Sequence, residues 1–354
     1  MHPPTVLILG AAGRFGGAAA QAFAQAGWRV LAQVRPERRT PNHAHPAIEW
    51  LPQDLHHHTA LQQAAAGATV VVHALNPRRY TDAAWQREVP QLAEHATSLA
   101  QALGATLMLP GNVYGYGSQL PAQLSEHTPP RPDHTKARVR VALEQRLQDR
   151  AQQGGPRTIV IRAGDFFGAG SGSWLDLVLA KDLQRGKLTL PGPLGVPHAW
   201  AYLPDLAQTF VRVAEQRERL PAFATLHFQG HTLTLDDWVA GLQGVAGPLR
   251  TQGMPWPLLR ALGLVSPTLR SLCGMRYLWQ RPHQLDNASL QGLIGTEPHT
   301  PWPDALHQAL HQHRLLALID LLGRTHHSHV VPVRFGGADH FSSAVNRQYR
   351  LVQL

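Results

Sequence analysis

The sequence predicts an α/β protein, built on a doubly wound parallel sheet with a smaller C-terminal lobe. Short apolar runs alternate with Ala-, Gln- and Leu-rich segments that are long enough to form crossover helices. The first run leads directly into a glycine-rich loop, and the alternation stops near Gly164. Apolar strands that lack strict alternation and are separated by helices indicate a parallel sheet covered on both faces.

Six apolar segments are expected to form the strands of this sheet: residues 5–9, 29–35, 48–51, 69–75, 106–110 and 158–162. A later segment, residues 202–216, places Leu206, Phe210 and Val213 on one helical face. This spacing predicts an amphipathic helix that returns to cover the sheet.

A glycine pattern follows the first predicted strand. Gly10, Gly13 and Gly16 form G-x-x-G-x-x-G at the start of a helix. Glycines permit a tight turn and close backbone approach, and a helix N-terminus offers free N–H groups to a pyrophosphate. The loop, with Arg14 and Phe15 between its glycines, therefore predicts a Rossmann-type dinucleotide site. A helix start without a ligand is the alternative interpretation.

The domain limits follow from the same pattern. Residues 1–165, completed by about residues 201–228, are assigned to the Rossmann domain. Residues 166–200 and 229–312 are assigned to a small substrate-binding lobe. Residues 313–354 lack a period of either kind and are left as a tail of uncertain order.

Composition narrows the classes of function. The chain has 354 residues, and none of its stretches approaches the roughly 18 uninterrupted apolar residues of a membrane helix. The N-terminus lacks a basic region ahead of its apolar run, so a cytoplasmic protein without a membrane partner is expected. The net charge of +9 comes from scattered residues without a nucleic-acid motif. A phosphorylated small molecule is therefore favoured over nucleic acid as the partner.

The end of the second strand bears on the choice of dinucleotide. An acidic side chain there would accept hydrogen bonds from the ribose 2′-hydroxyl of NAD, whereas this chain has Arg35. Cationic groups suit a 2′-phosphate, and Arg14 lies nearby in the loop, so NADP is favoured over NAD. Arg38 and Arg39 could add to this site or belong to a solvated loop.

At this point the chain resembles the extended short-chain dehydrogenase/reductase superfamily, in its sugar-nucleotide epimerase and dehydratase group. The matching pieces run in the family's order over about residues 5–310. They are "GAAGRFG" (10–16), "QDL" (53–55), "VVHALNP" (71–77), "NVYGYG" (112–117), Lys136, "IRAGDFFG" (161–168) and "AYLPDLA" (201–207). Together these pieces are specific, although each alone is not.

The resemblance implies cofactor contacts beyond the glycine loop. Asp54 and Leu55 would lie against the adenine, while His73, Ala74 and Leu75 would line the cofactor's path past the fourth strand. Asp54 could instead cap the helix that follows it.

The catalytic group of that family is a Tyr-x-x-x-Lys pair with a Ser or Thr from the fifth strand. Lys136 matches the lysine, which implies contact with the nicotinamide ribose. Pro132 stands at the tyrosine position and Pro110 at the hydroxyl position. Structural interpretations exist for both prolines: Pro132 starts a helix, and Pro110 ends the fifth strand.

Other side chains could replace the missing hydroxyls. Tyr116 and Tyr114 are the candidates on the loop, with His134 and Asp165 as further possibilities. The predicted substrate pocket is lined by Asn112, Asp165, Phe166 and Trp200, at the carboxyl ends of the strands. Packing and turn roles are the alternatives for these side chains.

The histidine runs at 56–58 and 326–329 do not predict a metal site, because adjacent residues at a helix start point in different directions. The leading hypothesis is an atypical NAD(P)-dependent oxidoreductase or epimerase acting on a small molecule. The alternative is a non-catalytic protein that senses NADP(H) on the same fold. Sugar-nucleotide chemistry would need a diphosphate clamp, for which Arg250, Arg260, Arg270 and Arg276 are candidates. The resemblance also implies dimerisation through a helix pair.

Overall fold

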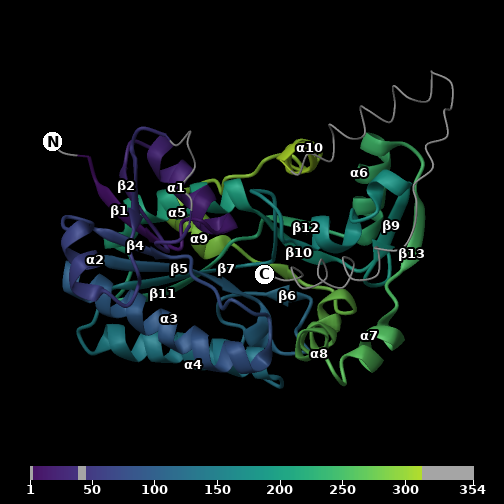
Figure 1. Ribbon diagram of the computed structural model, residues 1–354, viewed down its shortest axis with the longest axis horizontal. Coiled ribbons are helices and arrows are strands. Elements are labelled where there is room, and N and C mark those ends of the chain that lie inside the picture. The colour runs from purple at the N-terminus through teal and green to yellow at the C-terminus, as the bar shows by residue number, and fades with distance from the viewer. Residues whose placement is uncertain (1–2, 39–44, 313–354) are drawn as a thin grey trace.

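A parallel sheet of seven strands forms the larger part of the described structure (Figure 1). The computed structural model describes residues 3–38 and 45–312. The strand order is β11-β7-β5-β4-β1-β2-β3. These strands are β1 (Thr5–Leu9), β2 (Arg29–Val34), β3 (Ile48–Pro52), β4 (Val70–His73), β5 (Thr106–Asn112), β7 (Thr158–Ala163) and β11 (Phe223–His227). The predicted α/β class is confirmed.

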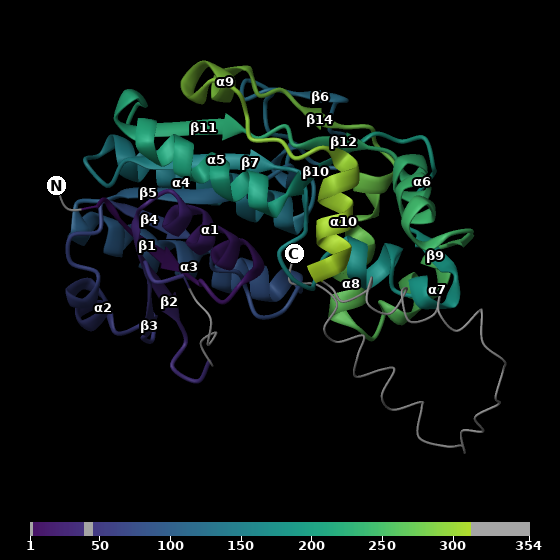
Figure 2. The same cartoon turned by 90° about the horizontal axis from the view of Figure 1, so that it is seen from above.

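Helices cover both faces of the sheet (Figures 1 and 2). One face carries α1 (Arg14–Gln25), α5 (Leu203–Gln216) and α9 (Ala288–Ile294), and the other carries α2 (His58–Ala64), α3 (Asp82–Leu103) and α4 (Thr135–Gln152). Along β1, Val6 and Ile8 enter one apolar core while Leu7 and Leu9 enter the other. The strands therefore read as continuous apolar runs, because each face is buried.

The small lobe is built around β10 (His198–Tyr202), which pairs with β8 (Asp165–Phe167) and β12 (His231–Leu233). Two short pairs join it: β9 (Lys187–Leu190) with β13 (Arg250–Gly253), and β6 (Gln123–Leu124) with β14 (Gln284–Leu285). Its helices include α6 (Leu235–Ala246), α7 (Trp256–Leu262), α8 (Pro267–Gly274) and α10 (Trp302–Gln312). Its core is unusually aromatic, with Phe167 touching Trp200, Trp238 and Trp302.

Two proline expectations need correction. The fifth strand does not end at Pro110 but continues to Asn112. Alternate N–H groups of β5 point toward β4, and that pairing stops at Met108, so the missing N–H of Pro110 faces an unpaired side. The fourth helix begins at Thr135 rather than Pro132, because the His134 side chain accepts a hydrogen bond from the Ala137 N–H and acts as the N-cap.

The helix predicted over 202–216 is confirmed as α5, which packs on α1. The tail expected at 313–354 lies outside the described residues.

Candidate functional site

The glycine loop joins β1 to α1 in a conformation that requires glycine at two positions. Gly10 has φ +81°, a backbone conformation that residues other than glycine rarely adopt. A Cβ at Gly16 would overlap the Gly10 carbonyl oxygen, so the helix could not lie this close to the strand. Gly13 is the N-cap of α1 and offers no capping side chain. The loop thus keeps a helix N-terminus open toward an anion.

Gln33, a residue that the sequence reasoning missed, supports this loop from β2. Its Oε1 accepts a hydrogen bond from the Gly10 N–H at 3.0 Å, and its Nε2 donates to the Gln53 carbonyl at 2.7 Å. Just beyond β2, Arg35 is exposed and lies 3.7 Å from Glu37. Arg38 is also exposed, and Arg39 lies outside the described residues.

Arg14 and Phe15 point into the protein from the start of α1. Burial lowers the pKa of Arg14 to about 10, although the charges of Asp176 and Asp165 oppose the shift. The Phe15 ring packs 4.7 Å from that of Phe210 on α5. Phe15 is buried, which makes it part of the core beneath the loop.

The residues after β3 and β4 lie on either side of the path predicted for the cofactor. Asp54 Oδ1 accepts a hydrogen bond from the His56 N–H, which lowers the pKa of Asp54 and forms a turn ahead of α2. After β4, Ala74 and Leu75 are the neighbours of Gly10, within contact distance of a Cβ built there. His73 is buried at the end of β4, and its Nδ1 accepts from the Leu75 N–H at 3.3 Å. Leu55 packs against the core.

Lys136 is 1% exposed and forms an ion pair across the site. Its Nζ lies 2.5 Å from Oδ1 of Asp82 at the start of α3, and 4.4 Å from the centre of the Tyr80 ring. The Ser271 hydroxyl, from α8 of the small lobe, donates to the same Asp82 oxygen at 2.9 Å. Burial lowers the pKa of Lys136, while the bond to Asp82 opposes the shift. Asp82 therefore connects Lys136 to the small lobe.

Arg140 lies one helical turn after Lys136, and the sequence reasoning missed it. Its guanidinium lies 5.2 Å from the centre of the Trp85 ring, and its buried Nε has no hydrogen-bond partner among the described residues. Burial lowers the pKa of Arg140. Burial lowers the pKa of His73 to about 3, and the charge of Arg140 adds to the shift. The sequence does show that Lys136 and Arg140 are four residues apart, a spacing that places two cations on one face of a helix.

Two tyrosines meet beside these cations. The hydroxyls of Tyr80 and Tyr114 are 3.3 Å apart, and burial raises the pKa of both phenols, with the Asp165 charge adding to the shift. From the small lobe, the Tyr277 hydroxyl lies 3.1 Å from His134 Nε2. Burial raises the pKa of Tyr277 and lowers that of His134. Tyr114 thus belongs to the same cluster as Lys136.

Tyr116 belongs to a different network, on the far side of β5. Its hydroxyl lies 2.9 Å from His227 Nε2 and accepts from Arg162 Nη1 at 2.7 Å, and Arg162 is paired with Glu144 at 2.5 Å. Burial raises the pKa of Tyr116 to about 12, while Arg162 opposes the shift. This buried network ties β5, β7 and β11 to α4, so the structure does not bring Tyr116 to Lys136.

The remaining predicted pocket residues lie where the sheet meets the small lobe. Asn112 Oδ1 accepts from the Tyr114 N–H, and the Phe166 carbonyl is 3.5 Å from Arg14 Nη1. Asp165 is paired with His198 Nε2 at 3.0 Å. Trp200 is fully buried within the small lobe, one strand away from Asp165.

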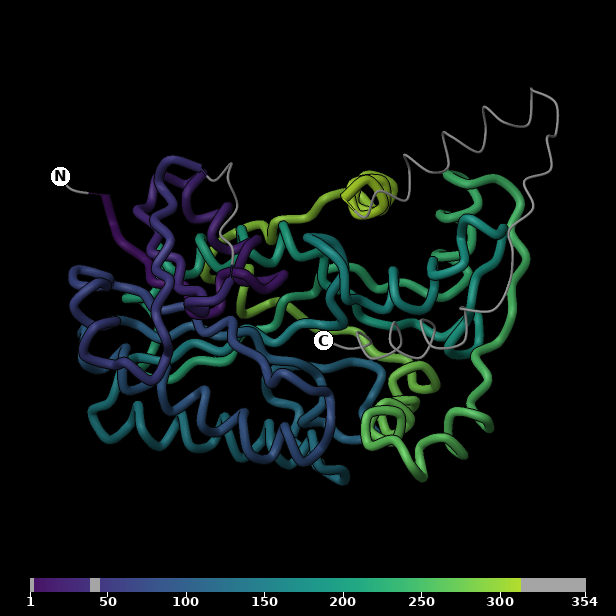
Figure 3. The backbone as a smooth tube through the Cα atoms, viewed as in Figure 1, coloured from purple at the N-terminus to yellow at the C-terminus, as the bar shows by residue number. Residues whose placement is uncertain are grey.

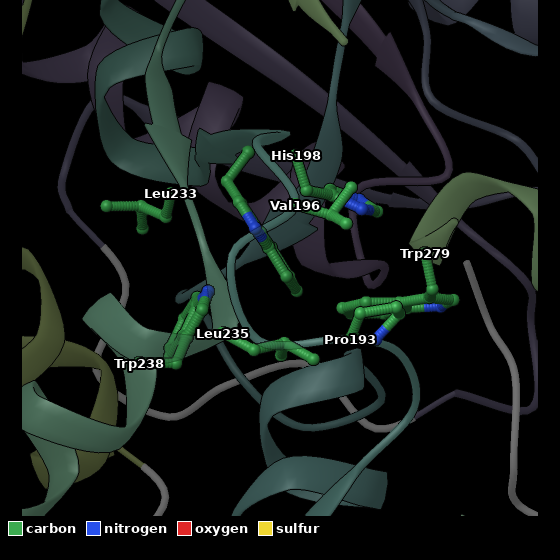
Figure 4. A pocket seen from close by; sticks show the side chains of 8 residues that line it. Pro193, Val196, His198, Leu233, Leu235, Trp238 and Trp279 are labelled. Atoms are coloured by element: carbon green, nitrogen blue, oxygen red, sulfur yellow. The ribbon is translucent and has the colours of Figure 1, made fainter. Parts of the chain in front are cut away.

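A narrow aromatic pocket lies behind His198 (Figure 4). In the view, the rings of Trp238 and Trp279 stand on opposite sides of it. The space is too small to hold a water molecule, so a ligand would have to displace side chains to enter. Its lining is apolar apart from His198 and the indole N–H groups: Pro193, Val196, Trp200, Leu233, Leu235, Trp238 and Trp279.

Two of the histidines after β3 pack against the same residue. His56 and His58 both lie against His95 of α3, with ring centroids 4.8 Å apart in each case. Among residues 3–38 and 45–312, no group of three His, Cys, Asp or Glu side chains is arranged to bind a metal ion. The second histidine run, at 326–329, lies outside the described residues.

Because Lys136 is buried and Asp82 is not, removing the charge of Asp82 is expected to destabilise the protein more than removing that of Lys136. Asp82→Asn is expected to lower the free energy of unfolding by about 3 kcal/mol, because it leaves a buried ammonium without its counter-charge. Lys136→Met is expected to cost less, about 1 kcal/mol, because the Asp82 side chain is 47% exposed and water can solvate it. Urea denaturation of each variant measures the difference.

The exposed ion pair between Arg29 and Glu49, at 2.7 Å, supplies the control. Glu49→Gln is expected to change the free energy of unfolding by less than about 1 kcal/mol. A smaller loss for Asp82→Asn than for Lys136→Met would contradict the assignment of Lys136 as the dependent partner.

Many solved structures share this fold. MoeE5 in complex with UDP-glucose and NAD is 16% identical with a TM-score of 0.67, and the match covers 88% of this chain and 99% of that one. UDP-N-acetylglucosamine 4-epimerase from Bacillus cereus is 13% identical with a TM-score of 0.66, covering 88% and 99%. UDP-glucose-4-epimerase from Stenotrophomonas maltophila, with bound NAD and formylated UDP-arabinopyranose, is 13% identical with a TM-score of 0.69, covering 92% and 100%.

At these identities the likeness shows the fold. The search of curated proteins finds no match. The family model for the NAD dependent epimerase/dehydratase family matches residues 6–225, which include the glycine loop, α4 with Lys136 and Arg140, and the start of β11. The chain therefore belongs to the NAD dependent epimerase/dehydratase family.

Proposed function

We propose that this protein is an NADP(H)-binding oxidoreductase or epimerase that acts on a small molecule. One observation carries the proposal: α4 carries two cations, the buried Lys136 and the half-buried Arg140, against Tyr80 and Trp85 in the segment that follows β4. In doubly wound sheets, ligands bind at the carboxyl ends of the strands. Family membership supports a nicotinamide dinucleotide as the cofactor.

The residues present fit a dinucleotide at both of its ends. At the phosphate end, the glycines leave room for close backbone approach, and α1 begins without a side-chain cap. At the other end, the orphaned Nε of Arg140 offers a donor to a ribose or phosphate oxygen. NADP is preferred in this proposal because Arg35 and Arg38 follow β2, where an acidic side chain would favour NAD.

The chain's own contribution to chemistry is the proton, while a bound nicotinamide supplies or accepts the hydride. The pKa values of Tyr80 and Tyr114 are raised by burial, so both phenols stay protonated at neutral pH. A protonated phenol donates to a substrate oxygen better than it removes a proton. Lys136 lies over the Tyr80 ring and stabilises any negative charge that develops on the tyrosine pair. In this proposal the pair works without the family's Tyr-x-x-x-Lys tyrosine, since Pro132 occupies that position.

A diphosphate clamp in the small lobe is not part of this proposal. Neighbouring structures are described with UDP-sugars bound. The aromatic pocket behind His198 is too narrow for a sugar nucleotide, and no lysine or arginine lines it, so a diphosphate site is not proposed there. Arg276, one of the clamp candidates, instead lies over the Trp256 ring. Dimerisation through a helix pair and a cytoplasmic location stay predictions.

The experiment is calorimetric titration of the full chain with NADPH and NADH at equal ionic strength. Arg140→Gln is expected to weaken NADPH binding by about tenfold or more, because it removes a charge-assisted contact. Arg138→Gln is the matched control, an exposed arginine on the same helix. Equal affinities for the two variants, with unchanged thermal midpoints, would remove Arg140 from the cofactor site.

A second candidate function is a non-catalytic NADP(H) sensor. The observation that favours it is burial: Lys136, Tyr80 and Tyr114 are each less than 5% exposed. The two functions differ in turnover. A screen of carbonyl and alcohol substrates that yields no NADPH consumption, in a protein that binds NADPH, would favour the sensor.

A further inference from the structure

A helical hairpin of the small lobe, α7–α8, presents four aliphatic side chains to solvent. They are Leu258, Leu262, Leu264 and Val265. At the tip, Leu264 is 76% exposed and Val265 is 83% exposed. Figure 3 shows this hairpin in green at the lower right edge of the molecule. Single exposed apolar residues are ordinary, but four within residues 258–265 form a patch that calls for a partner.

The tip is held in place by specific bonds. Arg270 Nε donates to the Gly263 carbonyl at 3.0 Å, and its Nη2 donates to the Leu264 carbonyl at 2.8 Å. At the base of the hairpin, the buried Trp256 donates from Nε1 to the Pro191 carbonyl at 2.9 Å. The exposed leucine and valine are therefore presented by a fixed backbone.

The charged residues in the sequence around the tip have a single sign. Residues 238–285 contain five arginines and no aspartate or glutamate. Arg260 and Arg270 are exposed on the hairpin itself. None of the five arginines forms an ion pair with a carboxylate in the part of the chain that the structure describes. On the hairpin, the exposed Arg260 and Arg270 thus carry positive charge that no carboxylate of the described residues neutralises.

We propose that the α7–α8 hairpin docks the protein on an anionic membrane surface. Leu264 and Val265 enter the boundary between headgroups and acyl chains, while Arg260 faces lipid phosphates. Arg270, whose guanidinium bonds to two carbonyls of the tip, adds its positive charge to the attraction. The patch is aliphatic and lacks the aromatic side chains that dominate protein–protein hot spots, which favours lipid over a protein partner. None of the described helices is long and apolar enough to cross a membrane, so the attachment is peripheral. This proposal revises the expectation of no membrane partner.

The docking helix also reaches the candidate site. Ser271 lies on α8, one residue after Arg270, and its hydroxyl bonds to Asp82, the partner of Lys136. One short helix, α8, therefore follows the membrane-facing tip and, through Ser271, contacts the Asp82–Lys136 ion pair.

The test is sedimentation of the full chain with vesicles of phosphatidylcholine alone and of phosphatidylcholine mixed with phosphatidylglycerol. Binding is expected only to the anionic vesicles and is expected to fall as salt is raised. The double variant Leu264→Asp, Val265→Asp is expected to weaken binding by about tenfold or more. Arg260→Gln is expected to weaken it by about fivefold.

Two control variants make the same kinds of substitution at exposed positions outside the α7–α8 hairpin. Leu194→Asp changes an exposed leucine elsewhere in the small lobe, and Arg138→Gln removes an exposed cation from α4. Both are expected to bind as the unaltered protein does. Binding to neither vesicle, or equal binding by the tip variant, would overturn the proposal. If the protein self-associates without binding vesicles, and the double variant at the tip abolishes that self-association, the patch belongs to an interface with a second copy. If vesicle binding appears only after deletion of residues 313–354, that segment of the chain is the occupant of the patch.

Discussion

Lowering the pH from 8 to 5 is expected to remove about 8 kcal/mol from the free energy of unfolding, enough to unfold a protein of ordinary stability. Four buried histidines account for the loss. Burial lowers the pKa of His73 and His283 to about 3 and that of His227 and His231 to about 4. Each contributes about 2 kcal/mol at pH 5, relative to an unfolded pKa of about 6.5.

The sign of the effect follows from where the protons bind. Between about pH 4 and 6.5 the unfolded chain holds these four protons and the folded chain does not, so stability falls as the pH falls. Urea denaturation at several pH values measures the slope. His283→Leu is expected to reduce that slope by about one proton. A stability that stays constant from pH 8 to 5 would show that the four imidazoles are not held neutral.

Gly16→Ala is expected to abolish nucleotide binding and to destabilise the protein by several kcal/mol. The added Cβ would overlap the Gly10 carbonyl oxygen, which belongs to backbone that cannot move without displacing β1 from α1. The expected loss of affinity is about a hundredfold or more, because the loop's N–H groups would no longer converge on a phosphate. Calorimetric titration with NADPH measures the affinity, and thermal unfolding measures the stability.

Gly17→Ala is the matched control one residue later. A Cβ at Gly17 would lie 3.4 Å from the Ala11 carbonyl oxygen, an ordinary contact, and alanine favours the helix. This variant is expected to bind nucleotide normally and to be as stable as the parent or slightly more stable. If both alanine variants bound NADPH equally, close packing at Gly16 would not be what shapes the loop.

Local patterns in the sequence predicted the parallel sheet, the glycine loop and α5. Each rests on neighbouring residues: buried strands are continuous apolar runs, and Gly10 and Gly16 mark a turn that other residues cannot form. The position of Lys136 in the site was also accessible, because the family resemblance fixed it to one helix.

The partners of Lys136 could not be found in this way. Asp82, Ser271 and Tyr80 meet it through tertiary contacts, from a helix start, a small-lobe helix and a loop that share no motif with it. Tyr116 shows the converse limit. It lies two residues from Tyr114, yet the short helical turn there sends its hydroxyl to Arg162 on the other side of the strand. Proximity along the chain did not predict which tyrosine faces the lysine.

The position of β11 at the edge of the large sheet has a consequence for synthesis on the ribosome. The strand it pairs with, β7, ends at Ala163, and the whole of β8, β9 and β10 is made before Phe223 emerges. Until then β7 is an open edge, which other chains can extend. Part of the cover on this face of the sheet is made later still. It forms when α9 packs on α5 and Glu297 accepts hydrogen bonds from the N–H groups of Gln229 and Gly230. If synthesis stalls within the small lobe, the nascent chain is therefore an aggregation-prone intermediate, which is expected to depend on chaperones.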